Sequence, residues 1–546
     1  MRFWVSLLWR RLASHALGFQ ALIIVISAFG GLISFFMPFG RDHGNYAYAG
    51  WAFNSGARLY QDVLSFKPPM TVYVHSFSQL AFGHHVWSIR MLDCVIISLI
   101  ALMIFRVLSA CFFSPKTAFM GSLFYLLQYW GYDYWNAAQT DHWAQLPIVL
   151  SILIILKPKP LSYSRCMLSG FLGMAAVLFK YPFIIIWLPI TVFLVVSNIR
   201  QYKTGRLVRS AIIATAMCMG GVVALLVFMS PMLSKQGLAS FMDVQAMMVA
   251  PYAKLGISLS APELLFKLLG VLFTHSSLLP TGILVFFATI LVVLVKRPRT
   301  QEDQHPAILV LSFLWLACAA LACLVQTKFF VYHYAPMLLP TAILGALAFD
   351  RLARRISPPG ASMKLWVPTV CCVAWWLVFL GDGLRENLRF AYDAWRHPSL
   401  PASYDRLAKA SMRDYSLVDI TLLADYLSEN TNSGDKVFIW GFDPTVNFLV
   451  RRFSPTRFIY NYPFRLDPHN SGWTRELLYD LHSNPPAKVV IARNDDTFQI
   501  TGNTCDSLQL LDLMPELSQY LQANYQKEGL IGSHYILLKP INLDNQ

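Results

Sequence analysis

Long apolar runs alternate with short polar turns through the first 381 residues of the chain. A helix that crosses a bilayer needs about 20 predominantly apolar residues. On that criterion the pattern predicts an α-helical polytopic membrane protein with about eleven spans, near residues 16–38, 86–106, 117–131, 143–156, 166–179, 181–197, 210–230, 277–295, 306–325, 332–349 and 364–381. The adjacent runs 166–179 and 181–197 are short, which favours two half-helices that meet at Lys180.

Two longer polar stretches, 40–85 and 231–276, interrupt this alternation. Within the first of them, Met70–Phe82 is apolar but short and rich in polar residues for a span. Such a segment is typical of a helix that lies along the membrane interface. We therefore expect both stretches to be loops on one side of the membrane.

The pattern changes in residues 382–546, where strand-like and helix-like segments alternate as in a soluble domain. The expected strands are Lys436–Trp440, Arg457–Tyr460, Val489–Ala492 and Tyr535–Leu538, and the expected helices are 415–430, 472–482 and 515–525. This alternation predicts a small α/β domain. The expected division is therefore a transmembrane domain, 1–381, with a large loop at 40–85, followed by a C-terminal domain, 382–546.

Composition agrees with a membrane protein and excludes two other classes. Hydrophobic residues make up 56% of the chain and charged residues 14%, whereas soluble domains have about a quarter charged residues. That excludes an ordinary soluble enzyme and a disordered protein. The net charge of +14 divides into +18 for residues 1–381 and −4 for residues 382–546.

The basic residues of the first part lie between the apolar runs, which is the positive-inside pattern of multi-pass proteins rather than a nucleic-acid-binding patch. Placing the five basic turns in the cytoplasm puts the N-terminus there as well. The loop at 40–85 and the C-terminal domain are then expected on the outer side.

The stretch Arg41–Pro69 carries the densest set of chemically capable residues. Asp42 stands where the first span ends, and either an interfacial acid or a catalytic base fits that position. Lys67, before two prolines, fits an interfacial lysine or a positive charge for a phosphate. A helix from about Tyr46 is expected to end at Gly56.

Three later segments hold further candidates: Ala138–Pro147 with Asp141, Phe179–Pro182 with Lys180, and Lys328–Pro336. Each has a structural interpretation beside the functional one. Lys180 suits the end of a half-helix, and His333 suits a packed interface. No His and Cys cluster with the spacing of a structural zinc site is present in the sequence.

Together these motifs resemble the GT-C membrane glycosyltransferases. The resemblance rests on Asp42-His43-Gly44, on Gly-x-x-x-Tyr-x-Asp ending at Asp62, on Lys67-Pro68-Pro69 and on the three later segments. Within that group, the sequence most resembles the bacterial glycosyltransferase-39-like proteins, which are relatives of the protein O-mannosyltransferases and the lipid A aminoarabinose transferases. The resemblance covers residues 1–381 and implies the GT-C fold.

The resemblance also implies roles. Asp42 would be the general base, and Asp141 would help to shape the acceptor site or position a cation. The donor phosphate would be bound by Lys67, Lys180, Lys328 and His333. The substrate would be shaped by His43, Tyr46, Arg58, Tyr60, Asp62 and Tyr332. The protein O-mannosyltransferases have two adjacent acids at this position, and His43 departs from that pattern. No residue is therefore assigned as a metal ligand, and whether the reaction needs a divalent cation stays open.

The implied reaction moves a sugar, with inversion, from a polyprenyl-phosphate donor to a hydroxyl of an exported lipid, glycan or protein. The implied location is the bacterial inner membrane, with the C-terminal domain in the periplasm. Two other classes stay open: a lipid or polysaccharide transporter or flippase, and a polyprenyl-pyrophosphate-dependent glycan ligase. A transporter predicts inverted repeats in hydropathy, which the sequence does not show.

Overall fold

The computed structural model describes residues 16–111, 113–156, 161–199, 205–255, 259–295, 305–356, 381–396, 407–502 and 504–541. Its contacts divide the chain into two compact units. The helical unit contains residues 1–37, 90–228 and 259–391, and the loop–tail unit contains residues 38–89, 229–258 and 392–546. The first loop thus packs with the C-terminal part of the chain. The expected division into a transmembrane domain, 1–381, and an external domain, 382–546, refers to position relative to the membrane. That division stays a prediction.

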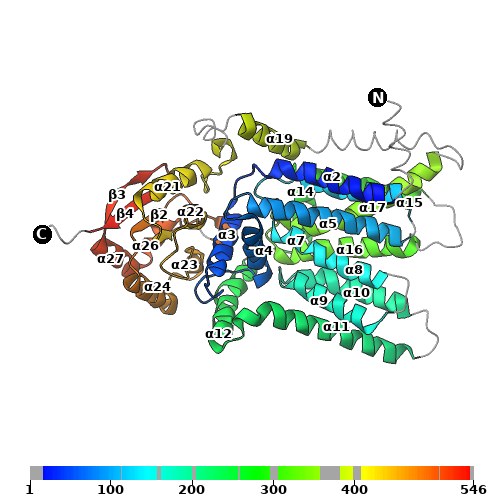
Figure 1. The fold of residues 1–546 in the computed structure, drawn as a ribbon, viewed down its shortest axis with the longest axis horizontal. Helices are drawn as coiled ribbons and strands as arrows, with labels where there is room; N and C mark the ends of the chain where they lie inside the picture. Colours follow the sequence, from blue (N-terminus) through cyan, green and yellow to red (C-terminus); the bar gives the residue numbers. More distant parts are fainter. Residues whose placement is uncertain are drawn as a thin grey trace. The chain divides into compact units, whose positions relative to one another are not determined.

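The helical unit is built from helices throughout, some of which extend past its boundaries (Figure 1). They are α2 (Ala16–Ser34), α5 (Ser88–Ala110), α6 (Pro115–Trp130), α7 (Thr140–Trp143), α8 (Gln145–Leu156), α9 (Tyr163–Val177), α10 (Phe183–Ile199), α11 (Arg206–Met229), α14 (Ala261–Thr274), α15 (Leu279–Leu294), α16 (His305–Gln326), η3 (Val331–Tyr334), α17 (Ala335–Ile356) and α19 (Gly381–Arg396). Helix α17 is central, since it packs against α6, α15 and α16.

Helices occupy ten of the eleven segments expected to span the membrane, and the eleventh, 364–381, lies almost entirely outside the described residues. Within the part of the chain that the structure describes, five helical segments are long and apolar enough to cross a membrane individually: Ala16–Ser34, Ser88–Ala110, Arg206–Met232, Ala307–Gln326 and Val331–Arg355. Helices α14 and α15 meet at an angle of 104°, as in a broken span or a re-entrant loop. The chain is therefore a helical membrane protein, and the total of eleven spans stays a prediction.

The expected break at Lys180 is confirmed, because α9 ends at Val177 and α10 begins at Phe183. Pro182 has no backbone N–H and cannot continue the preceding helix. The carbonyl of Lys180 accepts a hydrogen bond from the backbone N–H of Phe183 at 3.1 Å, which starts the second helix. The break leaves Lys180 outside both helices, in the connection between them.

The loop–tail unit combines helices from three parts of the sequence. They are α3 (Arg41–Asn54), α4 (Pro69–Phe82), η1 (Ser230–Met232), α12 (Lys235–Val244), η2 (Gln245–Val249), α13 (Ala250–Lys254), α21 (Leu417–Asn430), α22 (Thr445–Val450), α23 (Tyr462–Leu466), α24 (Ser471–Ser483), α25 (Phe498–Thr501), α26 (Ser507–Asp512) and α27 (Pro515–Asn524). As expected, α3 ends next to Gly56, and α4 covers the helix expected at Met70–Phe82. The two prolines after Lys67 stand at the start of α4.

A four-stranded sheet forms the centre of the C-terminal part, with strand order β1-β2-β4-β3. The strands are β1 (Val437–Trp440), β2 (Lys488–Ala492), β3 (Tyr525–Ile531) and β4 (Tyr535–Pro540). Strands β1 and β2 are parallel, whereas β4 runs antiparallel to both β2 and β3. Helices α21 and α27 contact β3, and α26 contacts β2 (Figure 1).

Three of the four expected strands are confirmed, and the strand expected at Arg457–Tyr460 is wrong. That segment is apolar because it is buried in an irregular stretch. Its backbone bonds to the first loop, since the Arg457 carbonyl accepts from the N–H of Leu64 at 3.0 Å. Strand β3 was missed because its sequence, YQKEGLI, is largely polar and exposed.

Candidate functional site

Asp42 occupies the first turn of α3, immediately after the apolar segment of α2 and its short connection. Among residues 41–50 it is the only one that is not buried. The N-terminus of a helix favours a negative charge, because the backbone N–H groups there are unsatisfied. Next to it, His43 Nδ1 accepts from the backbone N–H of Gly40 at 3.2 Å and closes the turn. Asp42 therefore lies, partly exposed, on a turn whose neighbouring residues are buried.

The preceding residue, Arg41, fixes this turn to the C-terminal part of the chain. Its guanidinium lies 3.1 Å from Asp414 Oδ2 and 3.7 Å from Asp443 Oδ1. The same group lies over the rings of Tyr415 and Phe442, at 5.1 and 5.4 Å from their centroids. Burial alone lowers the pKa of Arg41, but the two carboxylates outweigh it and the net pKa is raised. Arg41 thus stays charged while buried.

A cluster of aromatic rings lies next to Asp42 and Lys67. Phe66 is its centre, with ring centroids 6.4 Å from Tyr46, 6.5 Å from Tyr460 and 6.2 Å from Tyr462. Lys67 Nζ lies 5.1 Å from the centroid of Phe66. Asp42 precedes Tyr46 by four residues in α3, so the two side chains lie on the same face of that helix, one turn apart. Burial raises the pKa of Tyr460, and the charge of Asp42 raises it further. An acid and an ammonium group therefore border the same aromatic cluster.

The turn between α3 and α4 places the other candidates of the first loop. Tyr60 is fully buried, and its hydroxyl donates to the carbonyl of Lys67 at 2.8 Å. Arg58 and Asp62 form an exposed ion pair of 2.8 Å across the turn. Asp62 thus holds the loop, and the predicted residues His43, Tyr46, Arg58, Tyr60, Asp62 and Lys67 all lie in the loop–tail unit with Asp42.

The remaining candidates lie in the helical unit, around the break between α9 and α10. Lys180 Nζ lies 3.0 and 2.9 Å from the two carboxylate oxygens of Asp141, which is fully buried. The same Nζ lies 5.4 Å from the centroid of Tyr332, whose ring lies 4.8 Å from that of His333. The structure therefore brings together Asp141, Lys180, Tyr332 and His333.

Lys328 precedes this group in the turn between α16 and η3. Burial lowers its pKa, and the charge of Lys267 lowers it further. The Nζ of Lys267 lies 5.4 Å from the centroid of Phe329. Lys328 is thus close to a second cation on α14 that the sequence analysis did not single out.

Sequence reasoning also missed Arg41 and Asp93. Asp93 of α5 is buried and accepts hydrogen bonds from the hydroxyl of Tyr129 and, at 2.8 Å, from Trp143 Nε1. An acid within an apolar run, as at Asp93, is the sequence signal that indicates a buried polar network. The partners of Arg41 are 373 residues away or more, so the local sequence gives no signal for them.

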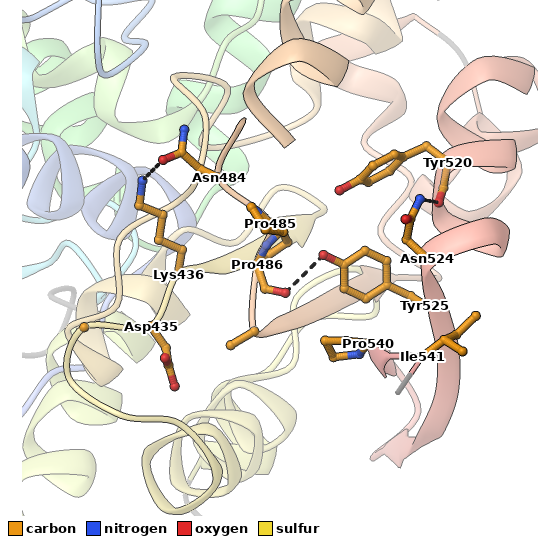
Figure 2. Close-up of a pocket in the computed structure, with 12 residues that line it drawn as sticks. Asp435, Lys436, Asn484, Pro485, Pro486, Tyr520, Asn524, Tyr525, Pro540 and Ile541 are labelled. Atoms are coloured by element: carbon orange, nitrogen blue, oxygen red, sulfur yellow. Dashed lines mark hydrogen bonds between the residues drawn. The ribbon is translucent and has the colours of Figure 1, made fainter. Parts of the chain in front are cut away.

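Among the described residues, no group of three or more His, Cys, Asp or Glu side chains has the arrangement of a metal site. A cleft of about 570 Å³ lies at one end of the sheet, where β1, β2 and β3 begin and β4 ends (Figure 2). Its lining includes Lys436, Asn484 and Tyr525, but none of the predicted site residues. The Tyr525 hydroxyl donates to the Pro486 carbonyl at 3.1 Å across this cleft (Figure 2).

Comparison with known proteins gives one family and several structures. Residues 66–234 match the sequence model of the family described as dolichyl-phosphate-mannose-protein mannosyltransferase. The crystal structure of ArnT from Cupriavidus metallidurans bound to undecaprenyl phosphate matches with a TM-score of 0.56 and 13% identity, over 97% of this chain and 99% of that chain. Its apo structure matches with a TM-score of 0.52 and 13% identity, over 96% and 98%.

The fold is that of the GT-C membrane glycosyltransferases. The resemblance found in the sequence motifs is thereby confirmed, and so is a helical membrane protein with a small sheet near the C-terminus. An apo oligosaccharyltransferase from Archaeoglobus fulgidus matches with a TM-score of 0.44 and 12% identity, over 96% of this chain and 75% of that chain. No curated protein matches the chain in sequence.

The segment that matches the family model, residues 66–234, includes only part of the candidate site. Lys67, Asp141 and Lys180 lie within residues 66–234, whereas Asp42 precedes that segment and Lys328 follows it. The roles of individual residues therefore stay predictions.

Proposed function

We propose that this protein is a membrane glycosyltransferase that moves a sugar from a polyprenyl phosphate to a hydroxyl of an exported lipid, glycan or protein. The observation that carries the proposal is that Asp42, one helical turn before Tyr46, and Lys67, next to the Phe66 ring, border one aromatic cluster in the loop–tail unit. A base and a fixed cation are the two groups that this transfer needs. Aromatic rings also suit the faces of a sugar.

Asp42 is proposed as the general base. Its carboxylate would accept the proton of the acceptor hydroxyl as that oxygen bonds to the anomeric carbon. The bond from this carbon to the phosphate oxygen would break at the same time, with inversion, and the polyprenyl phosphate would leave with the electron pair. The partly exposed position of Asp42 on an otherwise buried turn supports this role.

Lys67 is proposed to bind the donor phosphate. The leaving phosphate gains negative charge as the bond breaks, and a preorganised ammonium group stabilises that charge most where water is scarce. Lys67 is 8% exposed, so its side chain has already lost most of its water. The similar ArnT structure contains undecaprenyl phosphate, which supports a lipid phosphate as the leaving group.

The second cluster is proposed to support the same reaction. Asp141 would shape the acceptor site, with Lys180 as its counter-ion, and Lys328 and His333 would help to bind the phosphate. His43, Tyr46 and Tyr332 would border the substrate. We place the protein in the bacterial inner membrane with its C-terminal part in the periplasm.

The proposal is tested with purified protein in nanodiscs, a panel of polyprenyl-phosphate sugars and an extract of cell-envelope lipids and glycans as acceptor. Mass spectrometry measures free polyprenyl phosphate and glycosylated acceptor. Release of polyprenyl phosphate in step with acceptor glycosylation, from at least one donor, supports transfer. Movement of the intact donor across a liposome membrane without release would instead indicate a transporter and contradict the proposal.

A further inference from the structure

Arg457 connects three separate parts of the loop–tail unit. Its guanidinium donates to the carbonyl of Tyr60 in the first loop at 3.0 Å and to Glu476 Oε2 at 2.8 Å. It also lies 3.4 Å from Asp243 Oδ2, in the second loop. The Arg457 side chain is only 7% exposed, whereas the carboxylates of Asp243 and Glu476 lie at the surface, 37% and 38% exposed. Sequence analysis gave Arg457 no role beyond the expected strand.

The backbone of Arg457 holds the same turn from a second point. Its carbonyl accepts from the N–H of Leu64 at 3.0 Å, while the guanidinium holds the Tyr60 carbonyl. Within the turn, the N–H of Tyr60 donates to the Val63 carbonyl at 2.8 Å. The segment from Tyr60 to Leu64 is thus fixed at both ends by one residue.

Tyr60 needs such support, because its φ angle is +70°. This left-handed conformation costs a residue with a Cβ roughly 1–2 kcal/mol and persists only where the surroundings impose it. The Tyr60 ring packs edge-on against Phe241, with centroids 5.1 Å apart. Its hydroxyl then reaches the carbonyl of Lys67 at 2.8 Å. One continuous set of bonds therefore runs from Arg457 through Tyr60 to Lys67.

We propose that Arg457 is a positioning residue for Lys67 and acts through Tyr60. This inference rests on the proposed role of Lys67 in binding the donor phosphate. Arginine suits the position because its planar fork donates in several fixed directions, here to Tyr60, Glu476 and Asp243. Lysine would keep the charge but would not reproduce that set of bonds. The C-terminal part of the chain thereby sets the position of the phosphate-binding lysine.

The experiment measures binding of undecaprenyl phosphate to the full-length protein in nanodiscs. Tyr60→Phe removes only the hydroxyl that bonds to Lys67. Tyr520→Phe is the matched control, since its hydroxyl donates to the Leu481 carbonyl at 3.0 Å in the same unit. A typical hydrogen bond changes an equilibrium by about two- to tenfold. We expect Tyr60→Phe and Arg457→Lys to weaken binding by about that factor, and Tyr520→Phe to leave it unchanged.

Coupling to Lys67 separates positioning from a general structural role. Lys67→Met is expected to weaken binding about tenfold or more, since hydrogen bonds to charged groups are the stronger class. In that background, Tyr60→Phe is expected to have no further effect. Equal effects of Tyr60→Phe with and without Lys67 would overturn the inference, and so would an effect no larger than that of Tyr520→Phe.

Hydrogen–deuterium exchange of residues 58–67 gives a second measurement that needs no ligand. Arg457→Lys and Tyr60→Phe are expected to raise exchange there while leaving the sheet protected. Unchanged exchange in both variants would overturn the inference. If Lys67→Met binds undecaprenyl phosphate as wild type does, the proposed function of Lys67 fails. The exchange measurement then still decides whether Arg457 holds Lys67 in place.

Discussion

Lys180 and Asp141 form a buried ion pair in which Nζ contacts both carboxylate oxygens, at 3.0 and 2.9 Å. Asp141 is fully buried and the Lys180 side chain is 11% exposed. Two isolated charges would be costly in such a place, and the pair is tolerated because each neutralises the other. The helix break at Lys180 provides the geometry, since it releases this side chain from a regular helix.

Removing one partner of this pair is expected to destabilise the protein strongly. Lys180→Met leaves a buried carboxylate without its counter-ion, which costs about 3–5 kcal/mol in comparable pairs. The double variant Lys180→Met with Asp141→Asn removes both charges and should recover much of that loss. Equilibrium unfolding in mixed micelles measures each value. Equal stability of the single and double variants would contradict a direct pairing.

Gly44 is expected to be required where α3 approaches α22. A Cβ at this position would lie 1.7 Å from Thr445 Oγ1 and 2.9 Å from Thr445 Cα. Replacing glycine by alanine inside a helix normally stabilises it by about 1 kcal/mol. A loss of stability in Gly44→Ala would therefore come from the clash with Thr445. We expect Gly44→Ala to lower the stability of the protein by about 1–3 kcal/mol.

The control for that prediction is Gly434→Ala, because no heavy atom lies within 4 Å of a Cβ built at Gly434. Thermal unfolding of the two purified variants gives the comparison. The prediction is wrong if Gly44→Ala melts at the wild-type temperature or above it.

The turn between β3 and β4 is expected to lose stability as the pH rises. His534 Nδ1 lies 2.6 Å from Asp419 Oδ2, and Nε2 lies 2.9 Å from the Arg413 carbonyl. The bond to Asp419 raises the pKa of His534 above its ordinary value of 6.5. Because the pKa of His534 is higher in the folded than in the unfolded state, protonated His534 stabilises the folded state fully below about pH 6.5. That contribution to stability is lost as the pH rises through the pKa of the folded state.

The measurement is the difference in melting temperature between pH 6 and pH 8.5. We expect wild type to lose more than His534→Gln over this interval, since the variant lacks the titrating group. Identical differences in the two proteins would show that His534 contributes nothing to the pH dependence.

Local features of the sequence predicted much of the fold. The apolar runs located ten helical segments, the short runs 166–179 and 181–197 indicated the break at Lys180, and Met70–Phe82 was expected to be a helix, as α4 is. Each of these depends on residues that are neighbours along the chain. The strand expected at Arg457–Tyr460 failed because its burial comes from distant segments rather than from a sheet.

The sequence predicted which residues belong to the candidate site, but not which of them contact one another. Asp42, Lys67, Asp141 and Lys180 were singled out by motif, yet the pairing of Asp141 with Lys180 was not expected. Contacts of high sequence separation leave no local pattern. The bond from Arg457 to Tyr60 spans 397 residues, and that from Arg41 to Asp414 spans 373. Such contacts fasten the first loop to the C-terminal part of the chain.

The central claim is that Asp42 removes the proton from the acceptor. Asp42→Asn keeps the size and position of the side chain but cannot accept that proton. General-base catalysis contributes about 10²–10⁴-fold, so the rate should fall by that factor while undecaprenyl phosphate still binds. Asp496→Asn, which alters an exposed ion pair with Arg413, is the matched control.

The most direct test is therefore the rate at which each variant releases polyprenyl phosphate from a donor that wild type uses, in the presence of acceptor. We predict release at least about a hundredfold slower for Asp42→Asn and unchanged for Asp496→Asn. A wild-type rate for a correctly folded Asp42→Asn protein would contradict the account.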